Sequence, residues 1–113
     1  MAPPPRPSRA GAFRPVPGDS ATAVLGDHRR YPLCRVLVTC ALCGWAKGYD
    51  PERLIARLQA LRAGGYDTPV GAVAARIAWP CPMCRRVKWR TDLAWPADAD
   101  PRDIRRLTAM IRN

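Results

Sequence analysis

The sequence predicts a small α+β domain that a metal ion stabilises, and two observations lead to this prediction. The chain has 113 residues, which allows one domain and excludes a large α/β enzyme, a TIM barrel or a two-lobed binding protein. It also holds two C-x-x-C pairs, at residues 40–43 and 81–84, with helix signals between them. No apolar run approaches the roughly 18 residues of a membrane span, and no N-terminal stretch is typical of a signal peptide. We therefore expect a cytoplasmic protein.

Residues 1–30 are expected to form a disordered arm rich in Pro and Arg. Six of the 13 prolines lie in the first 17 residues, and the segment has no apolar periodicity. The arm is therefore predicted to be dispensable for folding. The rest of the chain, roughly 80 residues, forms a core so small that it usually needs a disulfide, a metal or a partner.

The folded part is expected to begin with a β-hairpin followed by a helix. Residues 35–39 (Arg-Val-Leu-Val-Thr) indicate a short strand, and residues 44–48 are expected to run back beside it. Asp50 is then the expected N-cap of a helix, with Pro51 at its first position. The Gly pair at 64–65 is expected to end that helix. Its apolar stripe consists of Leu54, Ile55, Leu58 and Leu61.

Two further helices begin with the same kind of signal. Thr68-Pro69 opens the second helix, which Pro80 stops directly before the second cysteine pair. Residues 87–91 are expected to form another strand. Asp100-Pro101 opens the third helix, with Asp103 as its partner in a weak capping box. The apolar stripes are Val70, Val73, Ala74 and Ile77 in the second helix and Ile104, Leu107 and Ile111 in the third.

The four paired cysteines are expected to bind one structural Zn²⁺. They are Cys40, Cys43, Cys81 and Cys84. Without a secretory signal, two C-x-x-C motifs favour a tetrahedral zinc site over a disulfide framework, and a thioredoxin-like motif accounts for only one of them. Two intervening residues let a tight turn direct both sulfurs at an ion about 2.3 Å away. Gly44 follows the first pair, where the turn favours positive φ. Arg85 follows the second pair and suits such a turn less well.

These elements together predict a zinc ribbon with a two-helix insert. The gap between the cysteine pairs, residues 44–80, is 37 residues, against about 15–20 in a compact ribbon, so the insert has structure of its own. We expect an arm over residues 1–30, a zinc-ribbon-like domain over residues 31–95 and a C-terminal helix over residues 96–113. Zinc binding then contributes on the order of 10 kcal/mol or more to folding, which stabilises the small core.

Residues 36–90 resemble short, largely uncharacterised bacterial zinc-ribbon-like proteins. The resemblance rests on Val38-Thr39-Cys40-x-x-Cys43-Gly44, on a following helix rich in Leu and Arg, on Thr68-Pro69, and on Arg76-Ile77 before Cys81-Pro82-x-Cys84. It implies zinc binding and no particular activity. The chain departs from that pattern by lacking a glycine after Cys84, which bears on the geometry of the second turn and not on the ligands.

The chain is strongly basic. It has 19 Lys and Arg against 9 Asp and Glu, a formal net charge of +10, which favours polyanionic partners. The densest cluster, here called the basic strip, consists of Arg85, Arg86, Lys88 and Arg90. Two interpretations remain open: the strip binds nucleic-acid phosphates, or it offsets the charge of −2 that four thiolates and one Zn²⁺ carry.

The other cysteine, the histidine and the tryptophans have structural interpretations. Cys34 is expected to be a buried free thiol and His28 a member of the arm, in preference to an auxiliary ligand pair. The tryptophans are expected mainly to pack beside the metal site and less to stack on bases; they are Trp45, Trp79, Trp89 and Trp95. If Lys88 and Arg90 face solvent on a strand, Trp89 between them faces the core.

These observations predict a non-catalytic module. Four cysteine ligands close the coordination sphere of zinc, and one histidine with the single glutamate, Glu52, gives no catalytic set. We expect no small-molecule substrate and no membrane insertion. Two functions remain: a DNA- or transcription-associated module that binds nucleic acid, and a zinc-stabilised adaptor that binds a protein. A thiol switch that loses zinc on oxidation is a third and weaker alternative.

Overall fold

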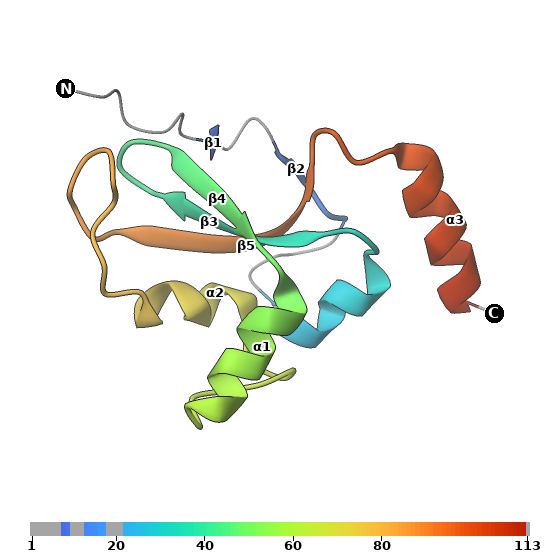
Figure 1. Cartoon of the computed structure of the whole chain (residues 1–113), viewed down its shortest axis with the longest axis horizontal. Coiled ribbons are helices and arrows are strands. Elements are labelled where there is room, and N and C mark those ends of the chain that lie inside the picture. Colours follow the sequence, from blue (N-terminus) through green and yellow to red (C-terminus); the bar gives the residue numbers. More distant parts are fainter. Residues whose placement is uncertain (1–7, 10–12, 18–21, 113) are drawn as a thin grey trace.

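A five-stranded antiparallel sheet forms the centre of the computed structural model, which describes residues 8–9, 13–17 and 22–112 (Figure 1). The strand order is β1-β4-β3-β5-β2. The strands are β1 (Ser8–Arg9), β2 (Phe13–Pro15), β3 (Arg35–Cys40), β4 (Trp45–Tyr49) and β5 (Trp89–Pro96). The helices are α1 (Pro51–Ala60), α2 (Val70–Val73) and α3 (Pro101–Arg112), and two 3-10 turns are η2 (Leu25–Arg30) and η3 (Ala74–Arg76). The predicted α+β class is confirmed.

The hairpin of β3 and β4 forms as predicted, and β5 pairs with the other side of β3. The pairs Val36–Tyr49 and Thr39–Ala46 set the register of the hairpin, and Cys40 faces Trp89 across β3 and β5. The strand predicted over residues 87–91 is wrong in its bounds, because it begins at Trp89 and continues to Pro96. Its length follows from pairing along the whole of β3, a contact between distant segments that residues 87–91 themselves do not reveal.

Helix α1 begins where the sequence predicts and ends earlier. Asp50 is the N-cap residue, although its side chain makes no capping hydrogen bond, and Pro51 opens the helix. The helix closes because Arg62 adopts a left-handed φ of 53° and the Ala63 N–H donates to the Leu58 carbonyl oxygen at 2.8 Å. That is the hydrogen-bond pattern of a Schellman turn, formed here before the glycines at 64–65 are reached.

The second predicted helix is much shorter than its apolar stripe suggests. Helix α2 covers four residues and passes into η3, after which Ile77 is extended. The predicted third helix is confirmed by α3, whose first turn is capped: the Arg102 N–H donates to Asp100 Oδ1 at 2.8 Å. Ile104 of α3 is buried and Leu107 half-buried. No helix within the described ranges is long and apolar enough to span a membrane.

The main core lies between one face of the sheet and the helices beneath it in Figure 1. Its most deeply buried side chains come from η2, β3, α1, α2 and β5 and are Leu25, Val36, Ile55, Val70 and Leu93. The Thr91 hydroxyl donates to the Val70 carbonyl oxygen and ties β5 to α2. A second apolar cluster adjoins the cysteines and contains Val38, Cys40, Cys81 and Trp89.

The predicted disordered arm is wrong for residues 8–9, 13–17 and 22–30. Strand β1 pairs with β4. Strand β2 pairs with β5, and Leu25 is completely buried in the main core. The Leu25 N–H donates to the Thr68 carbonyl oxygen and the Val70 N–H to the Ala23 carbonyl oxygen, both at 2.9 Å. This segment is held against the core by a few isolated apolar residues and by backbone hydrogen bonds. Such contacts leave no periodic apolar pattern in the sequence, so the sequence does not predict them. The prediction for residues 1–7, 10–12 and 18–21 falls outside the described residues.

Candidate metal centre

The first turn that carries two cysteines, here called the first knuckle, comprises residues 40–44 at the end of β3. Cys40 is the last residue of that strand, and β4 begins at Trp45. The Gly44 N–H donates to the Cys40 carbonyl oxygen at 3.0 Å, and Gly44 has a φ of 85°. This left-handed conformation is the one predicted for that position, and glycine adopts it without steric cost.

The second knuckle, residues 81–85, repeats this turn with arginine at the last position. The Arg85 N–H donates to the Cys81 carbonyl oxygen at 2.9 Å, and Arg85 has a φ of 65°. A left-handed conformation costs an L-residue about 1–2 kcal/mol, so the second turn is strained where the first is not. The Ala41 N–H also donates to the Lys88 carbonyl oxygen at 2.8 Å, which joins the two knuckles.

The two knuckles bring all four predicted cysteines together. Their sulfur atoms lie within 4.8 Å of one another, with 3.6 Å between the sulfurs of Cys40 and Cys84 and 3.5 Å between those of Cys43 and Cys81. Four sulfurs placed about 2.3 Å from a tetrahedral ion are about 3.8 Å apart, whereas a disulfide requires about 2.05 Å. The spacing therefore suits a metal ion. Of the four, Cys40 and Cys81 are buried, Cys84 is half-buried and Cys43 is exposed.

The ionisation of these thiols is strongly linked. Burial raises the pKa of Cys40. Hydrogen bonds from the backbone N–H groups of Cys43 and Leu42 and from the neighbouring thiols outweigh burial and lower this pKa to about 7. The Trp45 N–H lowers the pKa of Cys43, but burial and the neighbouring sulfurs raise it to about 12, and the pKa of Cys84 is also raised. Thiolates this close together repel one another, so a bound cation is needed to offset their accumulating charge.

Backbone donors support the sulfurs in both knuckles. The Met83 N–H donates to the Cys81 sulfur at 3.4 Å, and the Arg86 N–H lowers the pKa of Cys84 as that of Trp45 does for Cys43. In each case the donor follows its cysteine by two residues, so the turn itself supplies the hydrogen bond. Such outer contacts orient metal ligands, and the four cysteines are positioned to hold a metal ion.

Comparisons of the chain with protein-family models, curated proteins and solved structures find no match.

The basic strip lies on the return from the second knuckle into β5. All four of its side chains are exposed, and Arg90 forms an ion pair with Asp92 at 3.4 Å. Among the described residues, the other three strip residues make no ion pair. Trp89 is only 9% exposed, which confirms the prediction that it faces the core when Lys88 and Arg90 face solvent.

The tryptophans divide between two places. Trp45, Trp79 and Trp89 are in mutual ring contact beside the cysteines. Trp95 lies apart from them, with its indole N–H donating to the Pro32 carbonyl oxygen at 2.8 Å. The prediction of packing beside the metal site therefore holds for Trp45 and Trp89, whereas Trp95 packs against the main core instead. Trp79 contacts Trp89 but is 42% exposed.

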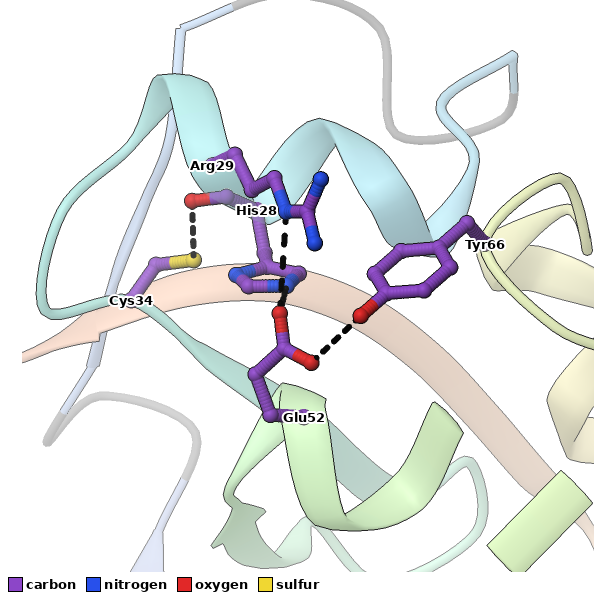
Figure 2. A network of polar contacts seen from close by, with 5 residues as sticks. All are labelled: His28, Arg29, Cys34, Glu52 and Tyr66. Carbon is purple, nitrogen blue, oxygen red and sulfur yellow. Dashed lines mark hydrogen bonds and ion pairs between the residues drawn. The ribbon is translucent and has the colours of Figure 1, made fainter. Parts of the chain in front are cut away.

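His28 and Cys34 belong to a separate polar network and not to the sulfur cluster (Figure 2). His28 Nε2 lies 2.9 Å from Glu52 Oε1, so the expectation that His28 belongs to a disordered arm is wrong. The Tyr66 hydroxyl donates to Glu52 Oε2 at 2.7 Å, and the Arg29 guanidinium lies 4.4 Å from the centre of the Tyr66 ring. The network fastens η2 to α1, and no spacing in the sequence signals it.

Cys34 is a buried free thiol, as predicted. Its sulfur points to the His28 carbonyl oxygen at 3.7 Å and not to the imidazole (Figure 2). Burial raises the pKa of Cys34 to about 12. A thiol that stays protonated at neutral pH is a poor nucleophile and a poor metal ligand.

Proposed function

We propose that this chain is a non-catalytic zinc-ribbon module that binds nucleic acid through a basic surface beside its metal centre. The single observation that carries the zinc assignment is the convergence of four sulfurs from two like turns. An all-thiolate tetrahedral donor set is typical of Zn²⁺ and of iron–sulfur centres, and the C-x-x-C turns with one ion are the structural zinc form. All four coordination positions are then filled, which leaves none for a substrate.

The charge distribution supports a polyanionic partner. Residues 31–49 and 68–91, which contain both knuckles, include no Asp or Glu. They include seven basic residues: Arg35, Lys47, Arg76, Arg85, Arg86, Lys88 and Arg90. Offsetting the −2 of a zinc–tetrathiolate centre requires two of these. Arg90 is also paired with Asp92. The four others exceed what compensation needs, so phosphate binding is the better interpretation of the basic strip.

The test is fluorescence anisotropy with labelled oligonucleotides at 50 and 200 mM salt. For a duplex, three to four phosphate contacts predict an affinity about 40- to 150-fold lower at the higher salt. The matched control replaces all four strip residues by Gln and is checked for unchanged zinc content; we expect it to bind much more weakly at 50 mM salt. Equal binding by the two proteins would exclude the strip as the site.

A protein-binding adaptor is the second candidate, and exposed apolar side chains at the metal end favour it. Leu42, Met83 and Val87 are 48%, 43% and 53% exposed, and the first two are the central residues of their knuckles. The affinity of such an apolar surface for a protein partner would depend little on the salt concentration. Capture of a protein from lysate after nuclease treatment, together with no binding to any oligonucleotide, would favour the adaptor.

A further inference from the structure

Trp79 is the exposed member of the tryptophan cluster beside the metal centre. Its ring lies 4.5 Å from that of Trp89, centre to centre, and 6.5 Å from that of Trp45. Trp89 is buried and Trp45 half-buried, whereas Trp79 is 42% exposed. Packing accounts for the face of Trp79 that contacts Trp89. It does not account for a large aromatic surface left in water, which is uncommon for tryptophan.

Trp79 is also held in place. The Trp89 indole N–H donates to the Trp79 carbonyl oxygen at 3.0 Å, and Pro80 follows directly. Cys81, two residues on, belongs to the second knuckle, where its N–H donates to the Arg86 carbonyl oxygen at 2.9 Å. An exposed ring whose backbone is held at its own carbonyl and in the knuckle that follows loses little conformational freedom when a flat ligand stacks on it.

The segments next to Trp79, in the chain and through its backbone contacts, are basic. Arg76 lies three residues before it and is exposed. The backbone contacts above bring Arg86 close to Cys81, and Lys88 directly precedes the tryptophan whose indole binds the Trp79 carbonyl. No acidic residue occurs in residues 68–91. An exposed aromatic ring in a stretch of chain with several cations and no acidic residue is the combination that favours single-stranded nucleic acid, in which bases are free to stack and phosphates are available to the cations.

We infer that the module binds single strands in preference to duplex, with one base stacked on Trp79 and the flanking phosphates on Arg76, Arg86 and Lys88. This inference rests on the proposed function and specifies its partner. The bases of a duplex are stacked on one another and offer no free face to the indole, so a duplex gains from the cations alone. Because every base has an aromatic face, we expect little sequence selectivity.

The experiment compares a labelled 20-nucleotide oligothymidylate with a 20-base-pair duplex at 50 mM salt. Wild type is expected to bind the single strand more tightly. Trp79→Ala is expected to bind it about 5- to 150-fold more weakly, the range for losing one stacked base, and to bind the duplex unchanged. Trp79→Phe retains a ring and is expected to keep most of the affinity. Zinc content verifies the fold of each variant.

A second readout does not depend on the stability of the alanine variant. Saturation with oligothymidylate is expected to quench the tryptophan fluorescence of wild type and of Trp95→Phe, which removes a distant indole. In Trp79→Phe the quenching is expected to be largely lost although binding continues. Quenching that persists in Trp79→Phe would overturn the inference.

The outcomes separate this inference from the proposed function. If Trp79→Ala binds the single strand as wild type does, while the Gln variant of the basic strip binds neither nucleic acid, the stacking inference is wrong and the proposed function stands. If wild type binds neither nucleic acid, both are wrong. If wild type sediments with phosphatidylserine vesicles and does not bind the oligothymidylate, the apolar and basic surface serves a membrane surface, and the inference is likewise overturned.

Discussion

Replacing Gly44 by alanine is expected to weaken zinc binding, whereas replacing Arg85 by glycine is expected to strengthen it slightly. A Cβ atom at Gly44 would meet nothing within 4 Å, so the cost of alanine lies in the backbone, where φ is 85°. That conformation costs an L-residue about 1–2 kcal/mol, and the smaller freedom of alanine in the unfolded chain offsets about 0.4–1 kcal/mol. The expected net loss is about 1 kcal/mol.

At Arg85 the same two contributions to the free energy have opposite signs. Glycine relieves a strain of about 1–2 kcal/mol at a φ of 65° and adds unfolded-state freedom worth about 0.5–1 kcal/mol. The expected net gain is therefore about 0.5–1 kcal/mol. Since Arg85→Gly also removes a cation near the thiolates, Arg85→Gln is the matched control that loses the charge and keeps the strain. Arg85→Gly compared with Arg85→Gln isolates the backbone effect.

The assay is competition for zinc against a chromophoric chelator. Because zinc binding and folding are coupled, a change of about 1 kcal/mol appears as about a fivefold change in the zinc dissociation constant. We expect Gly44→Ala to bind about fivefold more weakly than wild type, and Gly44→Asn to fall between them, because asparagine tolerates the left-handed region. Wild-type affinity in Gly44→Ala, or weaker binding by Arg85→Gly than by Arg85→Gln, would refute the equivalence of the two turns.

Three further predictions concern the rest of the molecule. Leu25→Ala is expected to lower the free energy of unfolding by about 2–5 kcal/mol, because Leu25 is completely buried; a loss below about 1 kcal/mol in urea unfolding would mean that its segment lies outside the core. Cys34, whose pKa burial raises to about 12, is expected to resist iodoacetamide at pH 8 until the protein is unfolded, and an adduct mapped to Cys34 by peptide mass spectrometry on the native protein would contradict this. Glu52→Gln is expected to reduce stability at pH 7, because a hydrogen bond from Tyr66 and the charges of His28 and Arg29 lower the pKa of Glu52. A lowered carboxyl pKa gives stability that is fully present above the unfolded value of about 4.3 and is lost as the pH falls through the lower folded value. The difference from wild type in urea unfolding should therefore narrow as the pH falls from 5 to 3, and a difference that stays constant over this range would be inconsistent with this.

The parts of the fold that the sequence predicts are those with local causes. Asp50-Pro51 and Asp100-Pro101 mark the first residues of α1 and α3 because a proline at the first helical position acts on its own backbone. The knuckles are predictable because two intervening residues suffice to bring two sulfurs to one ion. The apolar run before Cys40 likewise predicts β3.

The parts that escape prediction depend on distant partners or on an unfavourable local choice. The end of α1 depends on the left-handed backbone conformation of Arg62. An arginine in the sequence does not predict that conformation. The burial of Leu25 depends on backbone hydrogen bonds to residues 66 and 68, which lie about 40 positions away in the chain. The exposure of Trp79 follows from how α2 and η3 lead into the second knuckle, and composition gives no indication of it.

Metal analysis of the protein purified without added metal tests the central claim most directly. One zinc per chain is expected in wild type and in Cys34→Ser, because the Cys34 sulfur lies outside the cluster of four. Cys81→Ser is expected to lose the zinc and to unfold, since removal of one ligand opens the site that stabilises the small core. A wild-type protein that folds without metal, or a Cys81→Ser variant that keeps one zinc per chain, would contradict the account.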